Sequence, residues 1–439
     1  MSEAEIANAT RCEVLVVGGG PAGSTIAALL AQKGRDVVLL EKEKHPRFHI
    51  GESLLPLNLP LLEKLGVQEE VARIGMVKYG AEFISPYHGK TTTFNFAEAW
   101  NKNFPYAYQV RRSEFDLILL NNARSKGARV IEQCKVRDIE FLPEGGAIAR
   151  ASHLEGGEAL FQARFVVDAS GRDTFLANRL RIKSKNLKHN SAALYGHFTD
   201  ATRLEGDAEG NISIFWFDHG WFWFIPLADG TTSVGAVCWP YYLKQRRSDV
   251  TNFLMETVKL CPGIAERLAN AKLTGPATAT GNYSYKAKSM SGPGYLLLGD
   301  AFAFIDPVFS TGVYLAMNSA FVGCETVETC LQTPAKADRA LREFDARVRH
   351  ALDTFSWYIY RVTTPALRDM FMGPRNIFRV QEAMLSLLAG DIYGPSVIRR
   401  RLIVFKIIYY ASSLRRLRRS LLAWRSHKRA IAETAPEGV

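Results

Sequence analysis

Paired cysteines and long apolar runs are both scarce in this sequence. Six cysteines are spread over 439 residues without a C-x-x-C pair, so neither a cysteine zinc site nor a disulfide framework is indicated, and a reducing compartment fits best. No stretch reaches the ~18 apolar residues that a transmembrane helix needs. Residues 1–11 hold Glu3 and Glu5 but no apolar core, which argues against a secretory signal. We therefore expect a cytoplasmic protein that binds no metal.

Internal repeats and low-complexity segments are absent as well. Hydrophobic residues make up 47% and charged residues 23% of the chain, which is typical of a globular protein and excludes a collagen-like or disordered one. The length is about three times that of a ~150-residue domain, so one large domain or two joined domains are expected.

Acidic residues are rare at the C-terminal end of the chain. Residues 392–439 contain eleven Lys and Arg against two acids, a net charge of +9, which leaves only +2 of the total +11 for the rest. Because the body is nearly neutral, we expect no nucleic-acid partner. The basic tail is interpreted either as a solvated helix face or as a docking surface for an anionic membrane or a partner protein.

A glycine-rich turn lies inside the strand-helix-strand unit that the pattern predicts over residues 13–40. Glycines let a pyrophosphate approach the backbone, the helix N-terminus attracts its charge, and an acid after the second strand accepts from ribose hydroxyls. The unit therefore predicts dinucleotide binding, and the alternative is a merely tight turn. The candidate cofactor-binding residues of this unit are Gly18, Gly20, Ala22, Gly23 and Glu41.

The remaining pattern alternates between strands and helices. A loop rich in Pro, Gly and His covers 44–56, and ordered loops of this length are often functional. The other predicted elements are strands at 128–141, 146–153, 159–168 and 295–298, an antiparallel block at 192–239, helices at 57–65 and 313–331, and a helical region after about 335.

Two further motifs indicate which dinucleotide is bound. Gly299 and Asp300 close the predicted strand 295–298, and Arg112 lies in the segment 110–116. Together with the glycine-rich unit they resemble the FAD monooxygenase superfamily typified by p-hydroxybenzoate hydroxylase. The resemblance implies that Asp300 holds ribityl hydroxyls of FAD and that Arg112 lies along the cofactor; a turn or helix cap is the alternative for Asp300. Since no second glycine-rich unit is evident, reducing equivalents are expected from a separate NAD(P)H-dependent flavin reductase.

The hexapeptide at residues 221–226 reads Trp-Phe-Trp-Phe-Ile-Pro. With Lys78, it makes the chain from about Cys12 to Cys330 resemble the flavin-dependent halogenases, whose W-x-W-x-I-P signature it matches. On a strand, Trp221 and Trp223 share one face and can wall a cavity, although two such indoles are also ordinary core residues. The resemblance implies that this wall lines a tunnel and keeps organic substrate away from the flavin.

Lys78 lies in the apolar segment 75–83 and is the candidate catalytic residue. A lone lysine is usually a solvated surface charge, but within an apolar segment its amine can be desolvated and its pKa lowered. The resemblance implies that Lys78 captures hypohalous acid, by a hydrogen bond or as a haloamine, and directs electrophilic halogen to the substrate. It also implies that the loop carrying Ser53 is a strap beside the flavin; the alternative is a surface loop.

The segment Phe309-Ser310-Thr311-Gly312 falls where the resemblance implies a halide site. Thr311 and Gly312 open a predicted helix, whose unpaired N–H groups and dipole favour an anion. Tryptophan halogenases carry a glutamate where this chain has Phe309. This departure argues against tryptophan as the substrate and resembles the subgroup that acts on phenolic, pyrrolic or carrier-tethered substrates, with Phe309 in the substrate tunnel.

We therefore expect an α/β fold of the FAD-binding, Rossmann-like p-hydroxybenzoate-hydroxylase type, with an antiparallel substrate sheet and a helical C-terminal extension. The FAD-dependent module is expected over 1–335 and the basic helical region over 336–439. Within the module, the FAD-binding parts are expected at about 10–80, 105–180 and 285–335, and the substrate sheet at about 80–105 and 185–285.

The resemblance implies a halogenase that uses reduced FAD, O2 and chloride or bromide. Its substrate would be an electron-rich aromatic of secondary metabolism, either a small free molecule or one tethered to an acyl or peptidyl carrier protein. The rival interpretation is a flavin monooxygenase or a geranylgeranyl-reductase-like oxidoreductase on the same scaffold. That rival predicts a halide-independent product and a dispensable Lys78.

Overall fold

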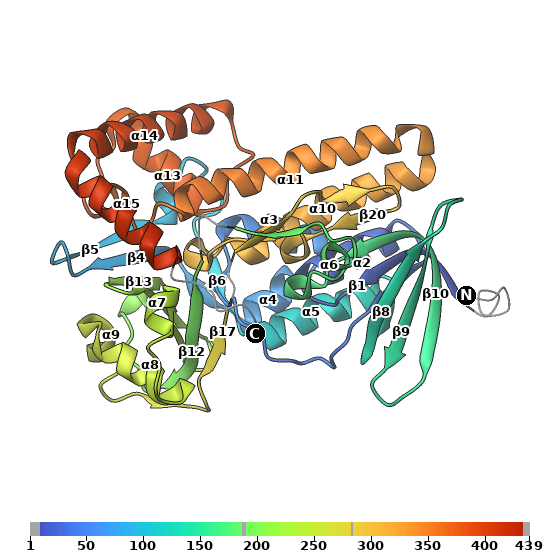
Figure 1. Ribbon diagram of the computed structural model, residues 1–439, viewed down its shortest axis with the longest axis horizontal. Coiled ribbons are helices and arrows are strands. Elements are labelled where there is room, and N and C mark those ends of the chain that lie inside the picture. The colour runs from blue at the N-terminus through green and yellow to red at the C-terminus, as the bar shows by residue number, and fades with distance from the viewer. Residues whose placement is uncertain (1–8, 187–189, 282–283, 433–439) are drawn as a thin grey trace.

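The computed structural model describes residues 9–186, 190–281 and 284–432. Two large sheets lie at opposite ends of the molecule, and the last helices gather beside strands β4 and β5 (Figure 1). The arrangement is the mixed α/β architecture that the alternating sequence pattern predicts.

The first sheet is built around β1 (Thr10–Val17), which lies between two parallel neighbours and is buried from Val14 to Val17. Its strand order is β19-β20-β10-β1-β2-β7, and β8 and β9 form an antiparallel extension of β10. The other strands are β2 (Val37–Leu40), β7 (Arg129–Ile131), β8 (Cys134–Phe141), β9 (Ala147–His153), β10 (Glu158–Asp168), β19 (Ser291–Gly292) and β20 (Tyr295–Leu297).

Helices cover this sheet and bury its apolar strands. Helix α2 (Pro21–Gln32) follows β1 directly, and it packs against α10 (Thr311–Gln332) and α5 (Arg112–Ser125). Helix α11 (Ala337–Ile359) runs along α10 (Figure 1). The ends of β1, β10 and β20 therefore meet the starts of α2 and α10, as is typical of dinucleotide-binding folds.

The second sheet has the order β16-β12-β15-β14-β13-β4-β5, with β17 also paired to β12. An antiparallel sheet was expected, but β13 and β4 pair in parallel. Parallel pairing is allowed here because a long crossover separates the two strands in sequence. The strands are β4 (Gly80–Ser85), β5 (Lys90–Asn95), β12 (Ala192–Thr199), β13 (Ile212–Phe217), β14 (Gly220–Pro226), β15 (Thr232–Cys238), β16 (Lys272–Leu273) and β17 (Thr278–Thr280).

Strand β14 separates two apolar cores because its side chains alternate between the two faces of the sheet. Trp221 and Trp223 belong to the main core, whereas Phe222 and Phe224 belong to a second core under α8 (Val250–Lys259) and α9 (Pro262–Arg267). The shared face of the two tryptophans, expected from the period of a strand, is confirmed.

Short elements connect the two sheets. The short strands are β3 (Met76–Lys78), β6 (Ala107–Gln109), β11 (Lys183–Lys185), β18 (Tyr285–Ala287) and β21 (Ala303–Phe304). The short helices are α3 (Leu59–Leu65), α4 (Gln68–Ile74), α6 (Phe175–Arg179) and α7 (Pro240–Leu243). The 3-10 helices are η1 (Pro56–Asn58), η2 (Phe96–Glu98), η3 (Gly171–Asp173), η4 (Gly206–Ala208), η5 (Gly299–Ala301), η6 (Pro307–Phe309), η7 (Pro334–Lys336) and η8 (Ile377–Arg379).

The chain ends in four further helices, as the pattern after residue 335 predicts. They are α12 (Pro365–Met372), α13 (Val380–Leu388), α14 (Ser396–Arg415) and α15 (Leu417–Ala432). Helix α12 packs on β4 and β5, and the backbone N–H of Trp100 donates to Ser386 Oγ on α13 at 2.9 Å. The helices thereby cover one side of the second sheet (Figure 1).

Candidate active site

A cavity of about 780 Å³ lies between the first sheet, the loop 44–56 and strand β14. Its volume is in the range of cofactor and ligand sites. Ten of the residues expected to form the site line it: Gly18, Gly20, Ala22, Glu41, Ser53, Arg112, Trp221, Trp223, Asp300 and Gly312. Five others are not among its lining residues: Gly23, Lys78, Gly299, Phe309 and Thr311.

The glycine-rich turn opens directly onto the cavity. A Cβ placed on Gly20 would meet only the Arg47 guanidinium, at 3.7 Å, so this position faces open space. A Cβ on Gly23 would lie 1.9 Å from the Gly18 carbonyl oxygen. Gly20 therefore leaves room for a ligand, whereas Gly23 allows the close packing of α2 against the turn.

The Glu41 carboxylate is fixed beneath this turn at the end of β2. Its Oε2 accepts a hydrogen bond from the backbone N–H of Gly19 at 2.6 Å, and its Oε1 accepts from that of Glu43 at 2.8 Å. The side chain is buried and lines the cavity. Its position after the second strand is the one in which an acid binds ribose hydroxyls in dinucleotide-binding folds.

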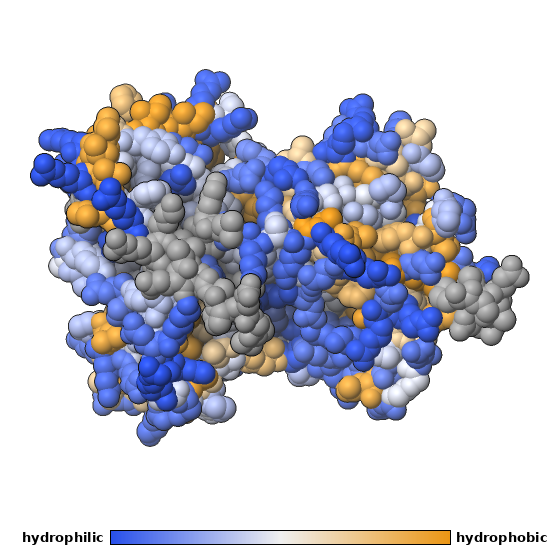
Figure 2. Space-filling model, viewed as in Figure 1, coloured by the Kyte–Doolittle hydropathy of each residue, from blue (hydrophilic) through white to orange (hydrophobic). Residues whose placement is uncertain are grey.

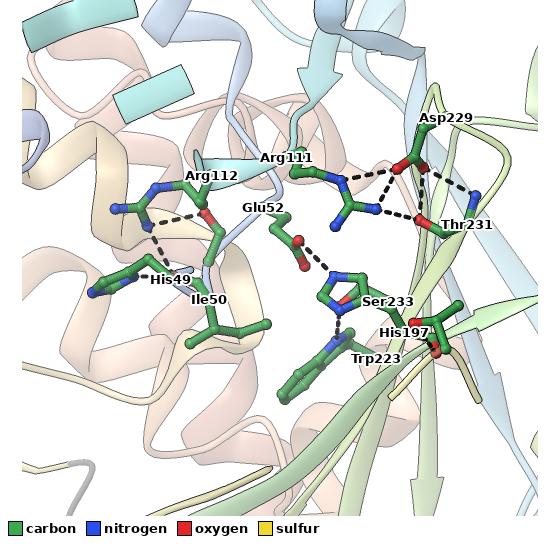
Figure 3. A network of polar contacts seen from close by, with 12 residues as sticks. His49, Ile50, Glu52, Arg111, Arg112, His197, Trp223, Asp229, Thr231 and Ser233 are labelled. Carbon is green, nitrogen blue, oxygen red and sulfur yellow. Dashed lines mark hydrogen bonds and ion pairs between the residues drawn. The ribbon is translucent and has the colours of Figure 1, made fainter. Parts of the chain in front are cut away.

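Arg112 ties the loop 44–56 to the start of α5. Its Nε and Nη2 donate to the two Asp116 oxygens at 2.8 and 3.0 Å. Its Nη1 donates to the Ile50 carbonyl at 2.8 Å, a bond drawn in Figure 3. Burial by itself would raise the pKa of Asp116, but Arg112 and Arg47 hold it below its usual value. Asp116 was missed by the sequence analysis, although its i,i+4 spacing from Arg112 signals such a pair.

The loop also places a buried carboxylate at the cavity. Glu52 Oε1 lies 2.8 Å from His197 Nε2 on β12, whereas Glu52 Oε2 is buried without a hydrogen-bond partner among the described residues (Figure 3). Phe48 packs edge-on against the His197 ring at 5.9 Å. The sequence analysis did not identify His197 or Phe48, because nothing local in sequence signals a contact between β12 and this loop.

Lys78 is one of the largest fully buried side chains, at 1% exposure, so the solvated-surface alternative is wrong. Its Nζ donates to Ser53 Oγ and to the Leu54 carbonyl, both at 2.8 Å. Burial lowers the pKa of Lys78 to about 7, as expected for a desolvated amine. The amine lies behind Ser53, which itself lines the cavity.

Asp300 lies on the cavity side of η5, directly after β20. Burial raises the pKa of its carboxyl to about 6. The preceding residue, Gly299, has a φ of +53°, and a Cβ there would lie 3.0 Å from Ala316. Gly299 therefore allows the backbone to turn close to α10 after β20, and Asp300 is the residue that can contact a ligand.

Helix α10 points its N-terminus at the cavity. Gly312 lies at the cavity wall with open space beside its Cα, whereas Thr311 is buried. The first-turn N–H groups of a helix this long favour an anion. Phe309 stacks on Phe371 of α12 at 6.1 Å with nearly parallel rings, so its ring packs against α12 rather than forming part of the cavity wall.

Trp221 and Trp223 form the opposite wall of the cavity. Their ring centres are 6.2 Å apart, and Trp223 Nε1 donates to Ser233 Oγ on β15 at 3.1 Å (Figure 3). Arg47 and Arg172 also line the cavity and were missed by the sequence analysis. Single arginines in loops carry no local signal of such a role.

Within the described part of the chain, no group of three or more His, Cys, Asp or Glu side chains is arranged to hold a metal ion. The cysteines at positions 12, 134, 238, 261, 324 and 330 are all free thiols. In the same part of the chain, no helix is both long and apolar enough to span a lipid bilayer.

Comparison with known proteins decides the family. The tryptophan halogenase family model matches residues 13–102 and 95–365. The 1H-pyrrole-2-carbonyl-[peptidyl-carrier protein] chlorinase of Pseudomonas fluorescens is 30% identical over 409 residues, covering 87% of this chain and 90% of that protein. The chain belongs to the flavin-dependent halogenases.

This chain covers different shares of the length of its other relatives. A tryptophan 2-halogenase of Chondromyces crocatus is 37% identical over 325 residues, which are 73% of this chain but only 61% of that protein. The structure of the myxobacterial chondrochloren halogenase has a TM-score of 0.77 at 35% identity and covers 87% of this chain and 90% of that one. A flavoprotein/dehydrogenase from Cytophaga hutchinsonii has a TM-score of 0.84 at 27% identity, covering 92% and 99%.

The cavity fits the cofactors of this family, FAD and a halide, which the sequence analysis expected. The open position at Gly20 and the arginines Arg47 and Arg112 suit a pyrophosphate, and the unpartnered Oε2 of Glu52 is an acceptor for a ligand donor. The Rossmann-like α/β fold of a flavin-dependent halogenase is likewise confirmed.

Proposed function

We propose that this enzyme halogenates an electron-rich aromatic substrate and that Lys78 is its catalytic residue. The observation that carries the proposal is the buried Lys78 amine, which is hydrogen-bonded to Ser53 at the cavity wall and has a pKa lowered to about 7. An amine with a pKa of about 7 is about half neutral at pH 7, and the neutral form can act as a nitrogen nucleophile, which a solvated ammonium cannot.

The remaining site residues have roles that follow from their positions. Reduced FAD, when bound, would supply the oxygen chemistry that oxidises halide to hypohalous acid. Gly20 and Arg112 would hold the cofactor, while the first turn of α10 at Thr311 and Gly312 would hold the halide. The Trp221 and Trp223 wall would keep the organic substrate from the flavin, so that oxidised halogen reaches it only through Lys78.

The substrate class that we propose is phenolic or pyrrolic, either free or bound to a carrier protein. Phe309 in place of a glutamate supports this class, and so does the similarity to a chlorinase that acts on a carrier-bound pyrrole. The relative named as a tryptophan 2-halogenase makes tryptophan a necessary comparison substrate. A separate flavin reductase would supply reduced FAD, because the sequence shows only one glycine-rich dinucleotide unit.

The rival function is a flavin oxidoreductase that does not use halide. The similarity to a flavoprotein/dehydrogenase over 92% of the chain supports keeping it as the second candidate. The two functions predict different dependences of the product on Lys78 and on halide, and both can be measured. The rival needs no buried amine, so its product would not depend on Lys78 or on halide.

Product analysis by mass spectrometry tests the proposal. The enzyme is incubated with FAD, a flavin reductase, NADH, O2 and chloride or bromide, and with phenol, pyrrole, carrier-bound pyrrole and tryptophan substrates. We expect a halogenated product from the wild type, and none from Lys78→Ala or from Lys78→Met, which keeps the volume of the buried side chain. Both variants should retain FAD binding and oxygen consumption.

Lys78→Arg serves as a charge-conserving control, and it should not restore activity because a guanidinium stays protonated. Lys64→Ala, at an exposed position of α3, controls for loss of a lysine elsewhere. The same halogenated isomer at wild-type rate from Lys78→Met would show that the role of Lys78 is wrong. A hydroxylated product from the wild type, with or without halide, would establish the rival function.

A further inference from the structure

An exposed row of large apolar side chains runs along α14 and α15. We name it the C-terminal seam; its members, each 43 to 69% exposed, are Ile403, Ile407, Tyr410, Leu414, Leu417, Leu421 and Trp424. The buried face of α14, by contrast, carries Ile398, Leu402, Phe405 and Tyr409. The seam is thus additional to the apolar face that attaches α14 to the protein, and Figure 2 shows hydrophobic and strongly hydrophilic residues side by side over these helices.

The spacing of the seam indicates what kind of surface covers it. Its α14 members, Ile403, Ile407, Tyr410 and Leu414, follow one another at intervals of four, three and four residues. On α15, after the helix break at Arg416, Leu417, Leu421 and Trp424 are spaced by four and three residues, and Leu422 is also exposed. The strict pattern on α14 gives the narrow stripe by which helices pair with one another, whereas helices that lie in a membrane surface have a broader apolar face. Within α14, this narrow stripe favours a helix as the occupant.

The charge around the seam indicates the charge of the helix that would bind there. Residues 396–432 contain eleven Lys and Arg and no Asp or Glu. Arg415 and Arg418, which lie beside seam residues, are both exposed. A second copy of this surface would bring like charges together, whereas an acidic helix would pair with them favourably.

The seam lies next to the substrate side of the site. Helix α12 packs against both α14 and α15, and Arg416 forms an ion pair with Asp369 of α12. On the same helix, Phe371 stacks on Phe309, two residues before the α10 N-terminus that is the candidate halide site. A partner bound at the seam is therefore one helix away from the segment that carries Phe309.

We propose that the C-terminal seam is the docking surface for an acidic, helical carrier domain that presents the tethered aromatic substrate. This inference rests on the carrier-bound branch of the proposed function and adds the surface that recognises the carrier. Apolar contacts along the seam would hold one carrier helix, and the surrounding arginines would pair with its carboxylates. The association is consequently weakened by salt as well as by loss of either group of side chains.

The test measures binding of an acidic peptidyl carrier domain, unloaded or loaded with pyrrole-2-carbonyl thioester, to the full chain at low and high salt. The seam variant is Ile407→Ser with Leu414→Ser, and the charge variant is Arg415→Glu with Arg418→Glu. The matched controls are Leu154→Ser and Arg73→Glu, which change an exposed leucine and an exposed arginine elsewhere. We expect each seam or charge variant to weaken binding about tenfold or more, and the controls to leave it unchanged.

Three results would overturn the inference. The first is equal carrier affinity in all variants. The second is no carrier binding while vesicles of phosphatidylglycerol and phosphatidylcholine bind through the same residues, which would make the seam a membrane surface. The third is self-association through the seam, seen by light scattering, without carrier binding.

FAD binding and halogenation of a free phenol are measured on the same variants. These readouts separate the two proposals, because the seam residues touch no part of the cavity. Halogenation that fails in the wild type, with seam-dependent carrier binding intact, would overturn the proposed reaction and still support the docking surface.

Discussion

The indole of Trp223 lies over the backbone of Gly235, in the space that a side chain at this position would fill. A Cβ on Gly235 would come within 2.3 to 2.7 Å of three atoms of the Trp223 ring. The neighbouring strand β15 thus provides the room in which Trp223 lies flat, with its Nε1 bonded to Ser233 two residues before the glycine. The wall of the cavity depends on a glycine that lies outside the halogenase signature.

We expect Gly235→Ala to destabilise the protein by about 1 to 3 kcal/mol, because the added methyl overpacks a filled core. It should also change tryptophan emission, since Trp223 has to move. Urea unfolding followed by fluorescence measures both effects. Gly275→Ala, where a Cβ meets nothing within 4 Å, is the control and should be close to neutral.

Gly20 and Gly23 should respond differently to substitution. Gly20→Val points its side chain into the cavity, so we expect a normally folded protein with FAD affinity reduced about tenfold or more. Gly23→Ala places its methyl against the Gly18 carbonyl, so loss of folding stability is expected. Thermal unfolding without FAD, together with an FAD titration, distinguishes the two. A Gly20→Val protein that binds FAD normally would contradict the assigned site.

Lys78 should make stability depend on pH. Because burial lowers its pKa to about 7, the folded protein binds fewer protons than the unfolded chain between pH 7 and the ordinary lysine pKa of 10.5. Stability contributed by this site therefore rises with pH across that window, by at most about 1.4 kcal/mol per pH unit.

Lys78→Met removes this dependence, so the variant should be relatively more stable than wild type at pH 6 and lose that advantage toward pH 10. Urea unfolding of both proteins at several pH values gives the difference. A difference that stays constant from pH 6 to 10 would show that the buried amine keeps an ordinary pKa.

Asp300 should make FAD affinity depend on pH. Burial raises the pKa of its carboxyl to about 6, so the side chain is ionised at pH 8 and increasingly protonated below pH 6. If the carboxylate accepts hydrogen bonds from ribityl hydroxyls, FAD affinity falls as the pH is lowered from 8 to 5. Asp300→Asn should bind more weakly at pH 8 and show a flatter profile, measured by quenching of FAD fluorescence. An unchanged wild-type profile after this substitution would exclude Asp300 as the cause.

Bromide should occupy the N-terminus of α10. The open space at Gly312 and the free N–H groups of the first turn favour an anion there. Anomalous scattering from bromide-soaked crystals locates the ion. Bromide that binds reproducibly at other positions, while this one stays empty, would contradict a halide site at the α10 N-terminus.

Local features of this protein could be predicted from its amino-acid sequence alone. The glycine-rich turn with Glu41 follows from residue spacing along one strand-helix-strand unit, and the shared face of Trp221 and Trp223 follows from the period of a strand. The helical, basic C-terminal region is likewise a matter of composition and spacing. These features can be predicted because each depends on residues within about one or two neighbouring helices or strands.

Contacts between distant parts of the chain could not be predicted in this way and were found in the folded structure. The bonds from Lys78 to Ser53 and from His197 to Glu52 join residues that are 25 and 145 positions apart in sequence. The same holds for the stacking of Phe309 on Phe371, which joins two rings 62 positions apart in sequence. Such contacts are set by how sheets and helices pack, and packing depends on shape and burial over the whole chain rather than on local periodicity.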